Sequence, residues 1–443
     1  MRVTYILTGM AFAFSATILY NIVAGQITDP SSEAYGDYQI YTEQPKFCDG
    51  YPAVAYETFY PISRAIMGSA LIAALEEFPH LLSPHLTDTL QSSLELNLKS
   101  NFTPTQSFYD TAYGLSTSFV ALWGGKNLNL SDSGINVTAQ GNELARQVID
   151  NYDQYRTIPE FNSVAWLTFT FWPLAMASKY LGDDLELGRR APDLIGSIWT
   201  DLAKWYHADL NNLAAPISRG FGYDLTKYMH SFGLLVWDLV GHEHSPYYLL
   251  HPTNPIPRVT DFTNGEHSVN GTAFIPTIDY EPQNLTAWLS DNITIGAVSL
   301  NEVSAGGPYS ESIYIPGAIQ WHTGDVNNEV GYINVYPNET SMHIVASPHL
   351  LNVSLPNATF TSSFQFQVVA FADGHDFDDW NDATGLSVKV TGRAASNFSV
   401  GFAGSLGGTG GSAIQEFEFW NVTYAMASDF KVGDVPWMVL EVY

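Results

Sequence analysis

The spacing of hydrophobic residues changes character along this chain near residue 255. Before that point hydrophobic positions recur with the period of an α-helix, and after it they alternate with the period of a β-strand. The proline-rich passage 251–258 lies at the change and suits neither element. The sequence therefore predicts a signal peptide at 1–25, a helical domain at 26–250, a linker at 251–258 and an antiparallel β domain at 259–443.

The first half predicts seven helices of two alternating kinds. One kind carries a hydrophobic stripe and a charged face, and it occurs near 83–98, 138–153 and 187–207. The other is apolar or aromatic on most sides and must be buried all round; it occurs near 109–123, 162–180 and 225–240. This alternation predicts two concentric layers, as in an incomplete α/α toroid. Pro173 should kink or split its helix.

The second half predicts an antiparallel β-sandwich built from segments rich in β-branched and aromatic residues. These segments are Ile313–Trp321, Gly331–Tyr336, Met342–Ala346, Phe360–Phe371, Leu386–Thr391, Phe398–Phe402, Ile414–Tyr424 and Trp437–Tyr443. Pro337–Thr340 is expected to close a hairpin, and the glycine-rich stretch Gly401–Gly411 to form a loop.

The N-terminus has the form of a secretory signal. Arg2 precedes an apolar run from Tyr5 to Ala24, and small residues before Gln26 suit cleavage by signal peptidase, although the run could also be retained as an anchor. Eleven N-x-Ser/Thr triplets support secretion and N-glycosylation. They begin at Asn101, Asn129, Asn136, Asn270, Asn284, Asn292, Asn338, Asn352, Asn357, Asn397 and Asn421. The single cysteine, Cys48, allows no intrachain disulfide.

The charge balance restricts the partners. The chain has 45 Asp and Glu against 17 Lys and Arg, a net charge of -28. Such a field repels nucleic acid and disfavours polyanionic substrates. No second apolar run is long enough to cross a bilayer, so we expect a secreted protein with no membrane span after signal cleavage and no nucleic-acid partner.

Two motifs and the overall layout carry a resemblance. Glu160-Phe-Asn-Ser163 and Ser218-Arg-Gly-Phe-Gly-Tyr-Asp224 resemble a family of uncharacterised secreted fungal and bacterial proteins. A signal peptide, a helical toroid and a trailing β domain resemble the toroid polysaccharide lyases of the heparinase and alginate-lyase type. That resemblance implies the fold and a lyase-type activity. The chain departs from those lyases in having about seven helices rather than ten or more, and its acidity disfavours a uronate polymer.

The predicted site lies where three inner helices begin. Clusters at Tyr109-Asp110, Asn162 and Tyr223-Asp224 should share one rim, with Arg219 nearby; the alternative is that Asp110, Asn162 and Asp224 only cap their helices. His230, off the hydrophobic stripe of its helix, is predicted as the base and Tyr223 as the acid. Arg219 or Asn162 would hold developing negative charge. The predicted substrate-binding residues are Tyr109, Asp110, Tyr113, Asp224 and Trp237.

Metal signals are weaker. The stretch Asp373–Asp382 holds five carboxylates and one histidine; it could bind calcium, but a solvated acidic turn is the preferred interpretation. His242-Glu-His244 lacks a third spaced zinc ligand. We therefore predict no cofactor, and a secreted, N-glycosylated enzyme with lyase, dehydratase or cyclase chemistry on a saccharide or a hydrophobic small metabolite. The alternative is a non-catalytic cell-wall or carbohydrate-binding glycoprotein.

Overall fold

The structure is a computed structural model of the chain. It describes residues 16–32, 34–39, 62–100, 111–130, 134–207, 210, 212–218, 266–275, 279–299, 315–324, 330–336, 341–370, 377–393, 398–406 and 417–443. Contacts divide the chain into two compact units. The first comprises Met1–Asp150 and Phe169–Leu194, and the second comprises Asn151–Thr168 and Ile195–Tyr443.

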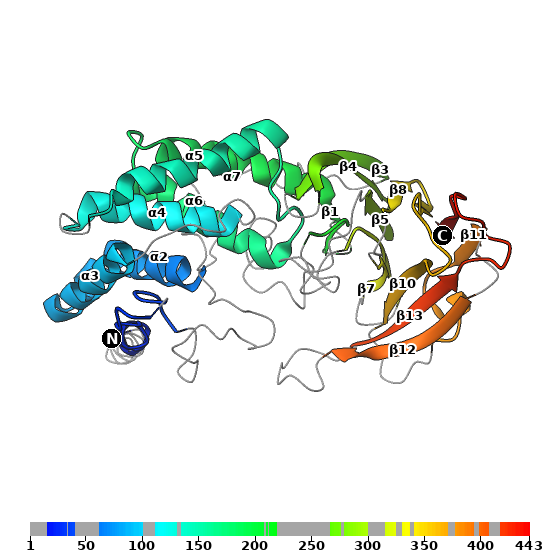
Figure 1. Ribbon diagram of the computed structural model, residues 1–443, viewed down its shortest axis with the longest axis horizontal. Coiled ribbons are helices and arrows are strands. Elements are labelled where there is room, and N and C mark those ends of the chain that lie inside the picture. Colours follow the sequence, from blue (N-terminus) through cyan, green and yellow to red (C-terminus); the bar gives the residue numbers. More distant parts are fainter. Residues whose placement is uncertain are drawn as a thin grey trace, which may run out of the picture. The chain divides into compact units, whose positions relative to one another are not determined.

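Seven helical segments lie among the described residues of the first half, namely residues 16–24 and six longer α-helices (Figure 1). The six are α2 (Ile62–Glu77), α3 (Pro84–Lys99), α4 (Thr111–Asn127), α5 (Val137–Tyr155), α6 (Val164–Tyr180) and α7 (Glu186–Trp205), and a short 3-10 helix, η1 (Pro79–Leu81), follows α2. Helices α3 to α7 match the predicted positions within a few residues, whereas α2 corresponds to none of the predicted ranges. The predicted helix near 225–240 lies outside the described residues. Pro173 does not split α6, which continues through it.

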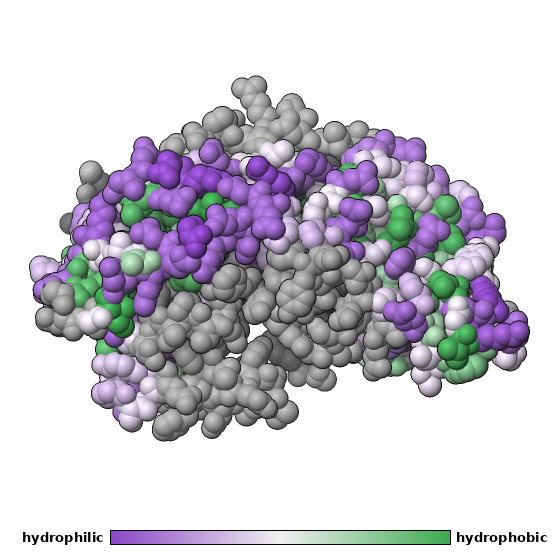
Figure 2. Space-filling model, turned by 45° about the horizontal axis from the view of Figure 1, so that its top comes forward, coloured by the Kyte–Doolittle hydropathy of each residue, from purple (hydrophilic) through white to green (hydrophobic). Residues whose placement is uncertain are grey.

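The predicted alternation of buried and half-buried helices is visible in the first unit. Every residue of α4 from Thr111 to Gly124 is buried. Glycines permit close helix packing there: a Cβ on Gly68 of α2 would lie 3.2 Å from Val120, and one on Gly141 of α5 would lie 2.9 Å from Ala121. By contrast α5 and α7 keep charged residues on their outer faces, and hydrophilic side chains cover much of the surface shown in Figure 2.

Strands of the second half form two antiparallel sheets, as predicted (Figure 1). The eight-stranded sheet has the order β12-β13-β10-β7-β6-β5-β4-β3, and the four-stranded sheet has the order β11-β14-β9-β8. The bounds of the first sheet are β3 (His267–Ile275), β4 (Asp279–Leu289), β5 (Ile293–Val298), β6 (Gly317–His322), β7 (Val330–Val335), β10 (Ser363–Ala370), β12 (Phe398–Leu406) and β13 (Phe417–Ala425). The second contains β8 (His343–Ser347), β9 (Leu350–Ser354), β11 (Val388–Gly392) and β14 (Trp437–Val442).

Two local predictions in this region were wrong. Residues 337–340 lie outside the described part of the chain, but the strands before and after them, β7 and β8, belong to different sheets and do not pair as a hairpin. The glycine-rich stretch is not all loop, because β12 continues to Leu406 and pairs with β13. Strands β3, β4, β5 and β9 were missing from the prediction.

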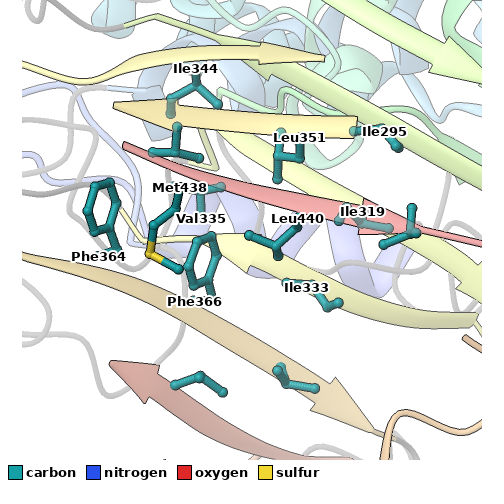
Figure 3. Packing of buried hydrophobic residues seen from close by; sticks show 14 of the residues in the cluster. Ile295, Ile319, Ile333, Val335, Ile344, Leu351, Phe364, Phe366, Met438 and Leu440 are labelled. Carbon is teal, nitrogen blue, oxygen red and sulfur yellow. The ribbon is translucent and has the colours of Figure 1, made fainter. Parts of the chain in front are cut away.

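The two sheets enclose one hydrophobic core (Figure 3). Ile295, Ile319 and Ile333 come from neighbouring strands of the large sheet, and Leu351 and Leu440 face them from the small one; each is at most 1% exposed in the intact fold. Successive strand residues point to opposite faces, so the residues between these positions lie on the outer face of the large sheet. The helical part followed by an antiparallel β-sandwich confirms the predicted fold class.

Candidate functional site

Two of the nine predicted catalytic and substrate-binding residues lie among the described residues. Tyr113 is buried in the first turn of α4, and Asn162 is buried in the turn before α6. The remaining seven lie outside the described residues: Tyr109, Asp110, Arg219, Tyr223, Asp224, His230 and Trp237. Their roles stay predictions.

Asn162 fixes a neighbouring chain segment. Its backbone has a φ of 51°, a left-handed conformation that asparagine tolerates better than most residues. Its Nδ2 donates to the carbonyl oxygens of Ala214 at 3.2 Å and Pro216 at 3.0 Å. The residue directly before α6 is Ser163, not Asn162, so Asn162 does not occupy the capping position. Its amide instead makes this contact. The structure therefore gives Asn162 a positioning role.

The segment Asn212–Ser218, here called the clamped segment, is also bound from the sheet. Gln320 of β6 donates from Nε2 to the carbonyl of Leu213 at 2.8 Å, and Asn212 donates to the hydroxyl of Tyr332 of β7 at 2.6 Å. Ile217 and Ile315 exchange two backbone hydrogen bonds of 2.9 Å. All these residues belong to the second unit. The clamped segment ends at Ser218, which directly precedes Arg219 in the sequence.

A glycine makes this contact possible. The backbone of Ala215 lies so close to Gly296 of β5 that a Cβ there would come within 1.6 Å of the Ala215 carbonyl oxygen. Real Cβ atoms do not approach backbone oxygen this closely, so only glycine fits this position. The other residues of β5 are apolar or β-branched, as is usual in a strand. The strand itself does not need a glycine, and Gly296 is needed because the clamped segment lies against it.

Glu160 is a candidate acid or base that the sequence prediction omitted from the site. It lies in the turn before α6, and its side chain is 0% exposed. Burying a carboxyl group is costly unless neighbouring groups hydrogen-bond to it, and such groups concentrate at functional sites. The backbone of the next residue, Phe161, accepts a hydrogen bond from Ser218 of the clamped segment at 3.2 Å. The available signal was a glutamate among the apolar residues Ile158, Pro159 and Phe161.

Uncharged polar side chains are buried on the outer face of the large sheet beside the clamped segment. Thr294, Gln320 and Asn334 are at most 3% exposed. Thr294 and Gln320 are direct cross-strand neighbours, and Gln320 is next to Tyr332. Within the described part of the chain, the Oγ1 of Thr294, the Oε1 of Gln320 and the Oγ of Ser218 have no hydrogen-bond partner. Buried polar atoms of this kind are exceptional and call for water or a ligand.

The acidic stretch near residue 380 behaves locally as a turn. The carboxylate of Asp382 accepts hydrogen bonds from the backbone of Asp378 and Asp379, and Asp379 accepts one from Asn381. Within the described part of the chain, no group of three or more His, Cys, Asp or Glu residues could hold a metal. Asp373, His375 and the His242–His244 motif lie outside that part.

The predicted glycosylation sites differ in exposure. The asparagine is exposed at Asn129, Asn136, Asn270, Asn284, Asn292 and Asn357, and half-buried at Asn352 and Asn421. Asn101, Asn338, Asn397 and Cys48 lie outside the described residues. Among the helices that the structure describes, none combines the length and apolar character needed to cross a membrane.

The chain is a two-part protein in which a helical half precedes a β-sandwich, and sequence-family models divide it in the same order. It belongs to the family described as Domain of unknown function (DUF8769), whose model matches residues 9–266. A second model, Domain of unknown function (DUF8770), matches residues 265–443. A comparison with curated protein sequences gives no match.

Solved structures of polysaccharide lyases resemble the chain weakly. Heparinase III, the BT4657 gene product with methylated lysines, is 9% identical at a TM-score of 0.35, covering 91% of this chain and 69% of that one. A mutant of heparan sulfate lyase HepC from Pedobacter heparinus is 9% identical at a TM-score of 0.36, covering 87% of this chain and 68% of that one. The predicted resemblance to a heparinase-like layout is confirmed as a resemblance. At these TM-scores any argument for function must come from the residues of this chain.

Proposed function

We propose that the protein is a secreted, N-glycosylated enzyme that acts on a saccharide by acid–base elimination or dehydration. The observation that supports this proposal best is the fully buried carboxyl group of Glu160 beside the clamped segment. That segment leads directly to Arg219, the first of the residues predicted to carry catalysis. A buried acid next to a fixed chain is what general acid–base chemistry needs, because the proton must be transferred over hydrogen-bond distance.

Elimination needs three groups. A base removes a proton from the carbon next to a carbonyl or carboxyl group of the substrate, and the electron pair moves onto that group's oxygen. A positive charge or hydrogen-bond donor stabilises this oxygen, and an acid protonates the departing oxygen as the carbon–carbon double bond forms. In the proposed site Glu160 and either His230 or Tyr223 act as the acid–base pair. Arg219 stabilises the negative charge that develops on the substrate. Asn162 acts through the clamped segment, because its amide is bound to two backbone carbonyls.

The substrate class follows from charge and from the buried polar groups. Net charge of -28 opposes a densely anionic polymer. Thr294, Gln320 and Ser218 offer neutral donors and acceptors, which match the hydroxyl groups of a sugar. We therefore expect a saccharide with few negative charges.

Secretion is supported by where burial begins. The helical residues 16–24 are mostly apolar, yet no residue from 16 to 25 is buried, whereas Gln26 and Ile27 are. Gln26 donates from Nε2 to the carbonyls of Gly36 at 3.1 Å and Ser93 at 2.9 Å. Among the described residues, burial thus begins at the residue before which signal peptidase is predicted to cleave.

The test is a Glu160→Gln variant, which keeps the shape of the side chain and removes its titration. Purified wild type and variant are incubated with a panel of oligosaccharides of low charge, and new carbon–carbon double bonds are followed by ultraviolet absorbance and NMR. We expect the variant to lose about a hundred- to ten-thousand-fold in rate. The matched control is Glu143→Gln, an exposed glutamate of α5 paired with Arg146, and it should keep full activity.

Thermal unfolding distinguishes the outcomes. If Glu160→Gln folds like wild type and turns over substrate at the same rate, Glu160 is no acid or base and the proposal is wrong. If the variant unfolds, Glu160→Asp decides, because it retains the carboxyl group and should recover part of the activity. A wild type that converts no member of the panel contradicts the proposal and favours a non-catalytic binding protein.

A further inference from the structure

A row of amide side chains crosses the outer face of the large sheet and continues the row of Gly296 and Ala318, on which the clamped segment packs. Asn334 of β7 is the cross-strand neighbour of Gln367 of β10, and Gln367 is the neighbour of Asn421 of β13. Asn421 in turn is paired with Gly401 of β12, the edge strand. We call these four positions the amide row. Asn334, Gln367 and Asn421 each lie between two residues of the hydrophobic core, so their amides point away from that core.

The buried end of the amide row has unused hydrogen-bonding capacity. Asn334 is 3% exposed, and neither its Nδ2 nor its Oδ1 has a hydrogen-bond partner among the residues that the structure describes. The Oδ1 of Asn421 is likewise buried without a partner. A buried amide without partners lowers stability, and natural proteins keep such groups when something else binds them. Two such residues in one row therefore point to a ligand rather than to a packing defect.

The other end of the row is open. A Cβ added to Gly401 would meet no heavy atom within 4 Å, so there is space above the edge strand. Exposure increases in the same direction, from buried Asn334 to half-buried Gln367 and Asn421 and then to exposed Gly401. A ligand can therefore approach over Gly401 and extend along the row.

The chemistry of this face selects for a neutral ligand. The next row along the strands consists of Gln365, Thr423 and Ser399, which are also uncharged hydrogen-bonding residues. Neither row contains an acidic or basic side chain that could compensate a charge on the ligand, and desolvating an uncompensated charge is costly. Sugar hydroxyls donate and accept at once, so they can satisfy both the Nδ2 and the Oδ1 of an amide.

We propose that the outer face of β7, β10, β13 and β12 is a binding site for a neutral saccharide, centred on Asn334 and Asn421 and entered over Gly401. This site uses none of the groups assigned to catalysis. It requires that Asn421 carries no glycan, although Asn421 begins a glycosylation triplet. A glycan attached at Asn421 would occupy the row itself.

Isothermal titration calorimetry tests the site with four neutral hexasaccharides of glucose (α-1,4 and β-1,3), mannose and N-acetylglucosamine, and a heparin hexasaccharide as the charged control. Wild type should bind at least one neutral probe and not the heparin probe. Asn334→Leu should weaken binding at least about ten-fold without lowering the melting temperature, because the amide that it removes has no partner. A merely structural amide would instead make this variant less stable.

Gly401→Thr provides the second variant. A branched residue suits a strand and meets no atom there, so the fold should persist while the entrance is blocked. The matched control is Val345→Thr, at an exposed strand position of the four-stranded sheet. Binding that survives both Asn334→Leu and Gly401→Thr overturns the proposal, as does a wild type that binds no neutral probe.

Glycopeptide mass spectrometry of secreted protein supplies an independent check. Asn421 should be unmodified while exposed sites such as Asn270 and Asn357 carry glycans, and a glycan found at Asn421 would overturn the proposal. The test is also separable from the proposed enzyme. Glu160→Gln should bind the neutral probe as wild type does, so loss of turnover alone leaves this site intact, and loss of binding alone leaves the catalytic assignment intact.

Discussion

Replacing Asp37 by asparagine should make the protein more stable at neutral pH. Asp37 is 0% exposed, and its Oδ1 accepts hydrogen bonds from the backbone of Tyr38 at 2.6 Å and from Ser63 Oγ at 2.9 Å. Burial raises the pKa of this carboxyl from 3.8 to about 7, although the charge of Arg64 and the two hydrogen bonds lower it. Asparagine keeps the oxygen that accepts both bonds and cannot ionise.

The pKa values give the direction and the size of the effect. Below pH 3.8 the carboxyl is protonated in the folded and the unfolded chain, so its contribution to stability is fully present. As pH rises further, the unfolded chain releases the proton while the folded chain keeps it up to about pH 7, and stability falls. At about 1.36 kcal/mol per pKa unit, the loss approaches roughly 4 kcal/mol above that pH, as an upper value.

Urea unfolding between about pH 5 and pH 8 measures this effect for wild type and Asp37→Asn. Across this range the free energy of unfolding of the variant should increase by a few kcal/mol relative to that of wild type. Asp29→Asn is the matched control: Asp29 is exposed, and hydrogen bonds from Ser31 lower its pKa, so its ionisation is complete before the range begins. Parallel curves for wild type and Asp37→Asn would refute the reasoning, because an ionisation that differs between the folded and unfolded chain must separate them.

Two further predictions concern the clamped segment and the start of the mature chain. Asn162→Gly keeps the left-handed backbone and loses two hydrogen bonds, so thermal unfolding should show a loss of about 1–3 kcal/mol, while Asn162→Asp should cost more because a carboxylate would face two carbonyl oxygens. Equal stability of these two variants would contradict the proposed contact. N-terminal sequencing of secreted protein should begin at Gln26, and enzymatic deglycosylation should lower its mass by several glycans; a chain that begins at Met1 with unchanged mass would contradict both expectations.

The elements of the fold were predictable because local spacing determines which residues can share a buried face. The apolar residues of α4 and the charged stripe of α7 were enough to distinguish a buried helix from a half-buried one. Partner choice was not predictable in the same way. In both β7 and β8 every second residue faces the same core. This alternation is the same whether two consecutive strands pair within one sheet or lie in opposite sheets of the sandwich, so it does not show which strands pair.

The site was less predictable, because its chemistry depends on burial. Asn162 was predicted as a catalytic residue, and that role stays a prediction, because an asparagine before a helix has the same sequence signature whether it caps the helix or binds a distant carbonyl. Glu160 was omitted because nothing in one sequence shows that a glutamate in a turn will be fully buried. Gln320 and Asn334 were visible in the sequence as polar residues within apolar strands. When both faces of a strand are otherwise apolar, such a polar residue indicates a buried hydrogen-bonding group.

Neighbouring rows of the large sheet show how the same residue types can have different roles. In the row of Thr294, Gln320 and Tyr332, the clamped segment takes up the Nε2 of Gln320 and the hydroxyl of Tyr332. Two residues further along β7, both polar atoms of Asn334 lack a hydrogen-bond partner among the described residues, although Asn334 is also buried. Amides that donate to backbone carbonyls hold the chain in place. Amides that are buried without a partner lower the stability of the fold, because no hydrogen bond compensates their loss of hydration. The second row therefore has the energetic character of a binding site, and the first has that of a structural support.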